Sequence, residues 1–193
     1  RFEIPKEQPE DKYFLYCGAA EYSAVIHFIL EVFEQLENKD HFLYLVVGGT
    51  DESKDKIKAR IAESPVSKRI KFFTRLPYDQ LVQKYLNAKA LLIPLRFNVQ
   101  DSARFPHKIG EYLASGNPMI STNVGEVKYY FTDGENALIS DSYETDAYKE
   151  KMQFVIDEPE KARQIGENGK AFGKATFDFP VFGQEIKSLI LTI

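Results

Sequence analysis

The feature that most constrains the fold is an alternation of short, continuously apolar segments with longer segments of helical periodicity. The apolar segments lie at residues 13–17, 42–47, 70–73, 90–94, 119–122 and 137–140. The main helical segments lie between and after them, at residues 23–36, 51–63, 78–86, 106–115, 143–157 and 159–176. A strand that is apolar throughout is buried on both faces, which is typical of a parallel sheet covered by helices.

The same alternation predicts the topology. Consecutive parallel strands are joined through a helix by a right-handed crossover. We therefore expect an α/β fold with a doubly wound, mostly parallel, Rossmann-like sheet. We assign residues 13–176 to this domain, residues 1–12 to an interdomain linker, and residues 177–193 to a C-terminal helix.

Charge and composition exclude several classes of function. The net charge of -4 gives no basic field of the kind that nucleic-acid binding requires. No apolar run approaches the roughly 18 residues that a membrane span needs. The single cysteine, Cys17, excludes a disulfide scaffold and favours a reducing compartment. We expect a cytoplasmic protein that binds no nucleic acid and has no membrane span.

The candidate binding residues are those that directly follow the predicted strands. In an open parallel sheet, ligands bind beyond the carboxyl ends of the strands. Gly18 follows the first strand, and Thr74, Arg75 and Leu76 follow the third. The longest such connection, residues 95–105, follows the fourth strand, and long connections are often functional. It carries Arg96, Asp101, Ser102 and Arg104 and leads directly to His107 and Lys108.

Lys108 lies in the first turn of the helix that follows this connection. A lysine there opposes the helix dipole unless an anion binds between the lysine and the free backbone N–H groups. Glu111 lies three residues later on the same face, where its carboxylate could accept from the two hydroxyls of a sugar diol. One ligand, with a phosphate and a sugar, could span both residues. The alternative is a solvated Lys108–Glu111 pair of small stabilising effect.

No other catalytic constellation is present in the sequence. The histidines, His27, His41 and His107, lack metal-ligand spacing, and neither a Walker A loop nor GxGxxG occurs. We therefore expect neither a metal nor a cofactor.

Residues 104–118, RFPHKIGEYLASGNP, resemble the donor-site helix of the group 1 glycosyltransferases, which are retaining enzymes of the GT-B fold. The family pattern is close to FPxKxxEYLASGxPxI. Residues 119–127 and 130–139 continue the resemblance, and residues 45–48, 71–81 and 85–94 carry weaker matches upstream. The resemblance covers the chain in order from residue 13 to about residue 176.

The resemblance implies a function and a set of roles. The chain would be the C-terminal domain, which binds a nucleoside diphosphate sugar for transfer to a carbohydrate or lipid-linked acceptor held by an N-terminal GT-B domain, as in polysaccharide biosynthesis. Glu111 would hold the ribose, and Lys108 and the helix start would face the diphosphate. The base would lie near the backbone of residues 74–76. Gly18 and His107 would border the same site.

Two departures from the family pattern affect the site. Many relatives carry a first glutamate eight positions before the second, where this chain has Ala103. Many also carry an arginine and a lysine after the first strand, where residues 19–23 contain no basic residue. The charge of the diphosphate would then be met by Lys108 and Arg104, which we take as the catalytic candidates. Asp101 is the candidate substitute for the missing glutamate.

Two other functions remain open from the sequence. A nucleotide-sugar epimerase-like domain shares the architecture, but it would need carboxylates poised for proton abstraction, and none can be assigned. A non-catalytic domain that binds a nucleotide or a protein partner is favoured slightly by the missing basic pair.

The chain is expected to be half of a longer enzyme, because it begins with Arg1 and its last segment is apolar on one side. It should fold alone, bind the donor weakly and not transfer sugar. We also expect an exposed apolar strip near the C-terminal helix or at the edge of the cleft. The apolar side of that helix carries Phe179, Phe182, Ile186, Leu189 and Ile190.

Overall fold

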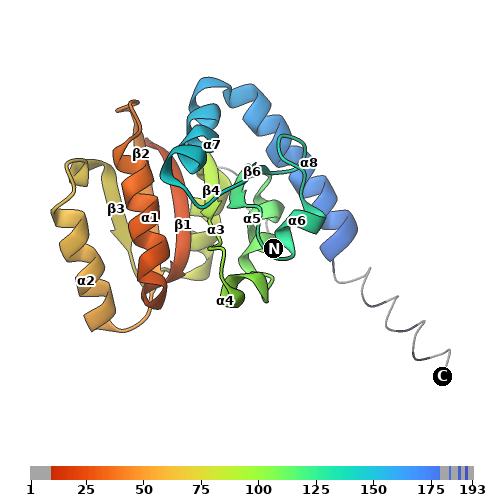
Figure 1. Ribbon diagram of the computed structural model, residues 1–193, viewed down its shortest axis with the longest axis horizontal. Helices are drawn as coiled ribbons and strands as arrows, with labels where there is room; N and C mark the ends of the chain where they lie inside the picture. Colours follow the sequence, from red (N-terminus) through yellow and green to blue (C-terminus); the bar gives the residue numbers. More distant parts are fainter. Residues whose placement is uncertain (1–9, 179–182, 184–186, 188–189, 191–193) are drawn as a thin grey trace.

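The strands form one fully parallel sheet. The computed structural model describes residues 10–178 and positions 183, 187 and 190. Its strands are β1 (Lys12–Ala19), β2 (His41–Gly48), β3 (Ile70–Phe73), β4 (Ala90–Ile93), β5 (Met119–Thr122) and β6 (Leu138–Ser140). They pair in the order β3-β2-β1-β4-β5-β6, and every pairing is parallel (Figure 1). This is the doubly wound order of a Rossmann-like sheet, so the predicted fold class is confirmed.

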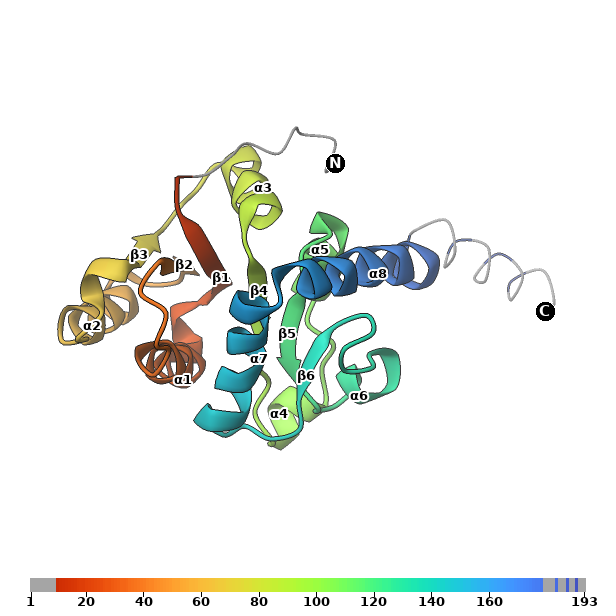
Figure 2. The same ribbon diagram turned by 90° about the horizontal axis from the view of Figure 1, so that it is seen from above.

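Helices connect the strands and cover both faces of the sheet. They are α1 (Ser23–Glu34), α2 (Asp51–Ala62), α3 (Tyr78–Asn87), α4 (Val99–Ser102), α5 (Lys108–Ser115), α6 (Val127–Tyr130), α7 (Thr145–Asp157) and α8 (Pro159–Phe177). In Figure 2, α1, α2 and α7 lie on one side of the sheet, and α3 and α5 lie on the other. The helices α4 and α6 are single turns that the sequence analysis did not predict.

The side chains of β1 alternate between two hydrophobic cores. Phe14 and Tyr16 pack with residues of α1 and α7, whereas Tyr13 and Leu15 pack with residues of α3 and α5. Successive strand residues point to opposite faces, so a strand in the middle of a covered sheet must be apolar on both. Leu15 and Phe14 have no exposed surface. The continuous apolar pattern of the sequence therefore has a direct physical cause.

The predicted linker overlaps the first strand. β1 begins at Lys12, and the preceding Asp11 accepts a hydrogen bond of 2.5 Å from the Tyr44 hydroxyl and pairs with Lys71. Asp11 and Lys12 therefore belong to the domain. Residues 1–9 of the expected linker lie outside the described part of the chain.

Two helix boundaries differ from the prediction. The helix expected at 106–115 begins at Lys108, because Pro106 and His107 form a preceding turn in which the Pro106 carbonyl accepts from the N–H of Ile109. The segment expected as a C-terminal helix from residue 177 differs too, because Phe177 is the last residue of α8. Beyond it, the described positions Gly183, Lys187 and Ile190 are helical, and Ile190 is exposed. The other residues of the predicted apolar strip, Phe179, Phe182, Ile186 and Leu189, lie outside the described residues.

Gly166 lets α8 pack closely on the turn between α5 and β5. A Cβ atom on Gly166 would lie 2.5 Å from the carbonyl oxygen of Gly116 and 2.7 Å from the carbonyl carbon of Asn117. These neighbours are backbone atoms, which cannot rotate away. Gly166→Ala should therefore lower the free energy of unfolding by about 1–3 kcal/mol, the usual cost of overpacking.

Denaturant unfolding monitored by circular dichroism measures this effect. Gly110→Ala is the matched control, because Gly110 also lies inside a helix but has nothing near its missing Cβ. That substitution should raise the free energy of unfolding by about 0.5–1 kcal/mol. Equal stabilities of the two variants would show that the packing of α8 tolerates a methyl group.

Candidate functional site

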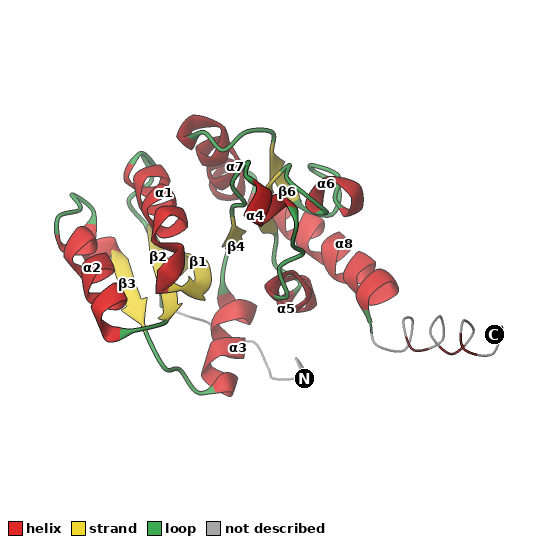
Figure 3. Cartoon of the chain, turned by 60° about the horizontal axis from the view of Figure 1, so that its bottom comes forward, coloured by secondary structure: helices red, strands yellow, loops and turns green. Residues whose placement is uncertain are grey.

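A cleft opens where the strand order reverses. The chain runs outward in one direction from β1 through β2 to β3 and in the other from β4 to β6, so β1 and β4 flank the switch point. Open parallel sheets bind ligands at this place, beyond the carboxyl ends of the strands. Figure 3 brings this edge forward, with α1, α4 and α5 around it. The cleft has a volume of about 320 Å³ and is lined by Tyr16, Cys17, Gly18, Ala19, Tyr22, Val25, Ile93, Pro94, Leu95, Arg104, Phe105, Pro106, His107 and Lys108.

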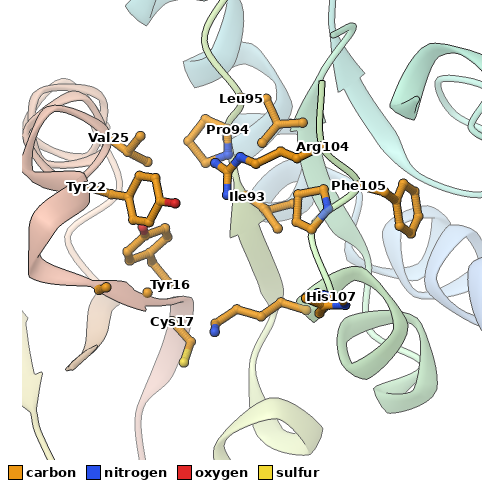
Figure 4. A pocket seen from close by; sticks show the side chains of 14 residues that line it. Tyr16, Cys17, Tyr22, Val25, Ile93, Pro94, Leu95, Arg104, Phe105 and His107 are labelled. Carbon is orange, nitrogen blue, oxygen red and sulfur yellow. The ribbon is translucent and has the colours of Figure 1, made fainter. Parts of the chain in front are cut away.

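The end of β1 and the turn after it form one wall of the cleft. Tyr16 and Tyr22 lie on this wall, and Arg104 reaches toward it from the opposite side (Figure 4). A Cβ atom on Gly18 would overlap the ring and hydroxyl of Tyr16. Glycine is therefore required at position 18 so that the Tyr16 side chain can lie across the backbone. The predicted site residue Gly18 thus borders the cleft through its backbone.

The connection after β4 forms the opposite wall and is held by a buried carboxylate. Asp101 has no exposed surface and accepts hydrogen bonds from the Nε of Arg96 at 2.7 Å and from the NH2 of Arg104 at 2.8 Å. It also accepts from the backbone N–H of Arg96 at 2.9 Å. Each arginine is partly exposed, so one buried negative charge joins two cations at the mouth of the cleft.

The charge of Asp101 depends on this network. Burial alone would raise its pKa, but the hydrogen bonds from Arg96 and Arg104 outweigh that effect and hold the pKa of Asp101 below its ordinary value. The carboxylate oxygens contact the two arginines, and Asp101 is not among the residues that line the cleft. The structure thus places Asp101 behind Arg104 and not in the cleft, where a substitute for the missing glutamate would have to lie.

Arg104 is fixed from two sides. Its guanidinium carbon lies 4.8 Å from the centre of the Tyr22 ring, in addition to its bonds to Asp101. A cation over an aromatic face is attracted by the ring, and the planar guanidinium keeps donors free for a ligand. The side chain lines the cleft with a third of its surface exposed. Arg104 is therefore a preorganised cation facing a cavity.

Lys108 is the second cation of the cleft. It is the first residue of α5, at the end of the helix where the dipole favours an anion, although the N–H of Ile109 in the same turn already donates to the Pro106 carbonyl. Lys108 forms no ion pair with any acidic side chain in the described part of the chain. Burial raises the pKa of the Cys17 thiol on the opposite wall, and the nearby charge of Lys108 partly offsets that rise. Lys108 therefore acts across the cleft on the end of β1.

Glu111 lies one turn beyond Lys108 and next to the cleft. It is half-buried, and its charge adds slightly to the raised pKa that burial gives the Cys17 thiol at the end of β1. The hydroxyl of Tyr112 accepts a hydrogen bond of 3.1 Å from the backbone N–H of Cys17 and ties α5 to β1. Tyr112 was not among the predicted site residues, although an inward-facing tyrosine in the EYLASG segment is a signal that could have found it.

The remaining predicted residues lie at the same edge of the sheet in two groups. His107 lines the cleft and is exposed. Thr74, Arg75 and Leu76 follow β3, which is separated from β1 by β2, and none of them lines the cleft. Arg75 has a left-handed backbone with φ 53° and an exposed side chain 3.8 Å from Asp51.

The described residues contain no cluster of three or more side chains that could hold a metal ion. Nδ1 of His41 lies 2.9 Å from the side-chain oxygen of Asn38, away from the cleft. Within the same part of the chain, no helix is long and apolar enough to cross a membrane.

The sheet order and the cleft at its switch point define a Rossmann-like α/β domain whose cleft is lined by two cations, Arg104 and Lys108. The family described as Glycosyl transferases group 1 matches residues 1–172. The chain therefore belongs to this family, and the resemblance seen in the RFPHKIGEYLASGNP segment is confirmed.

The individual similarities are distant and cover only part of each relative. The D-inositol 3-phosphate glycosyltransferase of Corynebacterium glutamicum is 27% identical over 141 residues, which are 73% of this chain and 32% of that protein. The chain spans between about a third and somewhat under half of the length of the first curated relatives that it matches.

Solved structures with lower sequence identity to this chain share its fold. Anabaena Alr3699/HepE, in complex with UDP and glucose, has a TM-score of 0.80 at 15% identity over 95% of this chain and 49% of that one. The C-terminal domain of a group 1 glycosyl transferase (LpcC) from Francisella tularensis has a TM-score of 0.69 at 13% identity and 89% coverage of both chains. These likenesses confirm the predicted C-terminal half of a GT-B fold.

Proposed function

We propose that this chain is the donor-binding domain of a retaining glycosyltransferase and that it binds a nucleoside diphosphate sugar in the cleft between β1 and β4. The observation that carries the proposal is the pair of cations, Arg104 and Lys108, that line a cavity of about 320 Å³ at the switch point. The family membership of the chain supports it, as does the complex of the structurally similar HepE with UDP and glucose.

The cations and the helix start fit the charge of a leaving diphosphate. During glycosyl transfer the bond between the sugar and the diphosphate breaks, and negative charge grows on the phosphate oxygen. Arg104, Lys108 and the positive end of the α5 dipole would stabilise that charge without rearranging, because Asp101 and Tyr22 already fix Arg104. The acceptor, a carbohydrate or a lipid-linked sugar, would approach from an N-terminal domain across the cleft.

A second candidate is a non-catalytic nucleotide-binding domain. The observation that favours it is the absence of basic side chains on the β1 wall, where Ala19 and Ala20 precede the exposed Glu21. Position 103, where many relatives have a glutamate, is an exposed alanine. An epimerase-like function lacks such support, because no carboxylate lines the described cleft.

Titration calorimetry with UDP, GDP and ADP tests the proposed function. At least one of the three should bind to this chain, and it should bind more tightly than its own nucleoside because the phosphates contact Arg104 and Lys108. Failure of all three to bind, or equal binding of nucleotide and nucleoside, would contradict the proposal. A sugar-release assay on the longer protein then separates an enzyme from a non-catalytic binder, which would bind the donor without releasing sugar.

Glu111→Gln tests the expected ribose contact. If the carboxylate accepts from both ribose hydroxyls, its loss should weaken binding of the nucleoside diphosphate by about 1.5 kcal/mol, roughly tenfold. The melting temperature should not change. The 2′,3′-dideoxy form of the same nucleotide should bind the natural chain and the variant equally. Glu150→Gln on α7, an exposed glutamate outside the cleft, is the control. A lower melting temperature with unchanged affinity would make Glu111 a structural residue.

A further inference from the structure

Tyr16 is a buried tyrosine whose hydroxyl forms no hydrogen bond with any described residue. Only 5% of the residue is exposed, and what is exposed lines the cleft between β1 and β4. No residue in the described part of the chain forms a hydrogen bond with this hydroxyl. The other large tyrosines of the same core differ, since the Tyr148 hydroxyl donates to the Ile120 carbonyl at 2.8 Å. Unlike the unpaired Tyr143 hydroxyl, the Tyr16 hydroxyl is not fully buried, so a ligand or water in the cleft can supply its partner.

The surroundings of the hydroxyl point to a negatively charged ligand. The Tyr16 ring crosses the backbone at Gly18, which has no side chain to displace it. Arg104 is close enough that its charge acts on the Tyr16 hydroxyl, and Lys108 acts on the adjacent Cys17 thiol. The β1 wall therefore faces two cations across the cleft. An anion held by Arg104 and Lys108 would lie against this wall.

The hydroxyl is a donor at neutral pH. Burial raises the pKa of Tyr16 well above its ordinary value, and the positive charge of Arg104 offsets only part of that rise. The phenol therefore keeps its proton in the range in which phosphates are ionised. A neutral donor next to a phosphate oxygen forms a charge-assisted hydrogen bond.

We propose that the Tyr16 hydroxyl donates a hydrogen bond to a diphosphate oxygen of the nucleotide held between Arg104 and Lys108. Tyr16 would thus supply, from the strand itself, a contact on the wall that carries no basic side chain in this chain. Tyr22, the other tyrosine of the wall, lies under the guanidinium of Arg104. This inference rests on the proposed donor-binding function and assigns a further binding residue to the same site.

Tyr16→Phe removes the hydroxyl and keeps the ring. We expect the variant to bind the preferred nucleotide among UDP, GDP and ADP about 10- to 100-fold more weakly than the natural chain. Binding of the corresponding nucleoside, which lacks phosphate, should be unchanged. The melting temperature should not fall, because the lost hydroxyl has no partner in the described structure. Calorimetry and thermal unfolding measure these effects.

Tyr143→Phe is the matched control. Its hydroxyl also forms no hydrogen bond with a described residue, but it is fully buried, and Tyr143 stacks on Phe28 and does not line the cleft. This variant should bind the nucleotide as the natural chain does. An equal loss of affinity in both variants would overturn the assignment, since the effect would then not be local to the cleft.

The outcomes separate the inference from the function on which it rests. If a nucleotide binds the natural chain and Tyr16→Phe binds it equally well, the assignment of Tyr16 is overturned while donor binding stands. An equal loss for nucleotide and nucleoside would also overturn it, because the contact would not be with phosphate. A loss that appears only with the nucleotide sugar and not with the free nucleotide would move the contact to the sugar. If no nucleotide binds the natural chain, both proposals fail.

Discussion

Lys108→Ala is expected to weaken binding of the nucleoside diphosphate by about 1.5–3 kcal/mol, or roughly 10- to 150-fold. Lys108 lines the cleft at the first turn of α5 and has no acidic partner among the described residues, so its charge is available to a ligand. A cation placed against its own helix dipole is stabilised when an anion binds between them. Calorimetry on the natural chain and the variant, at one fixed salt concentration, measures the change.

The control for this substitution is Lys128→Ala on α6, which removes an exposed lysine outside the cleft and should leave the affinity unchanged. The free energy of unfolding of Lys108→Ala without ligand should be equal to or above that of the natural chain, because an unfavourable dipole interaction is lost. Unchanged nucleotide affinity in Lys108→Ala would remove Lys108 from the site.

Asp101→Asn is expected to lower both the stability and the affinity for nucleotide. The substitution keeps the shape of the side chain but leaves Arg96 and Arg104 without the carboxylate that joins them. Removing one partner of a fully buried ion pair costs about 3–5 kcal/mol. Because both arginines reach water, we expect a loss of about 2–3 kcal/mol in the free energy of unfolding.

The pH dependence of this loss has a defined sign. The pKa of Asp101 is lower in the folded protein than in the unfolded chain, where it is about 3.9. The stabilisation is therefore complete above about pH 4 and is lost as the pH falls through the folded pKa. Asp101→Asn should lie well below the natural chain at neutral pH and converge with it under acid conditions. Asp146→Asn, at an exposed pair with Lys149, should stay within about 0.5 kcal/mol of the natural chain at every pH.

Nucleotide affinity separates the positioning effect of Asp101 from its effect on folding. Measured at a temperature where the variant is fully folded, Asp101→Asn should bind the nucleoside as the natural chain does and the nucleoside diphosphate more weakly, because Arg104 is no longer fixed. Equal stability of the variant and the natural chain at neutral pH would contradict the network. Unchanged diphosphate affinity would show that Arg104 acts without it.

The strands and the long helices could be predicted from the sequence because their patterns extend over enough residues. The segments 70–73 and 119–122 were predicted with the boundaries that β3 and β5 have, since each is apolar and bounded by polar or turn residues. A single helical turn such as α4 or α6 contains too few residues to show a period. Proline at position 106 favours a helix start, yet α5 begins two residues later, and the turn closed by the Pro106 carbonyl and the Ile109 N–H overlaps its first residues.

The position of the cleft could be predicted only in part. The sequence places every strand end at one edge, but it does not state which strands are neighbours. The strand order places residues 74–76 two strands away from Gly18, and it brings the connection after β4 against the end of β1. Lys108, Arg104 and His107 were predicted from the family pattern and line one cavity. Tyr16 was missed, because a tyrosine within an apolar strand segment looks like a core residue.

Asp101 shows that the role of a charged residue depends on whether the fold buries it. Its spacing of three residues from Arg104 is compatible with a pair, but a surface pair and a buried network have the same sequence. Only the packed connection after β4 removes Asp101 from water and brings Arg96 to its second oxygen. The same packing determines whether the Asp101 carboxylate contacts a ligand directly or holds Arg104, which lines the cleft.

A crystal structure of this chain with the nucleoside diphosphate that binds it tests the central proposal most directly. We expect the two phosphates between Arg104 and Lys108, with their oxygens within about 3.2 Å of the cationic nitrogens, and the ribose next to Glu111. Phosphates located at another edge of the sheet, or a cleft between β1 and β4 that stays empty at saturating nucleotide, would contradict the donor site that we propose.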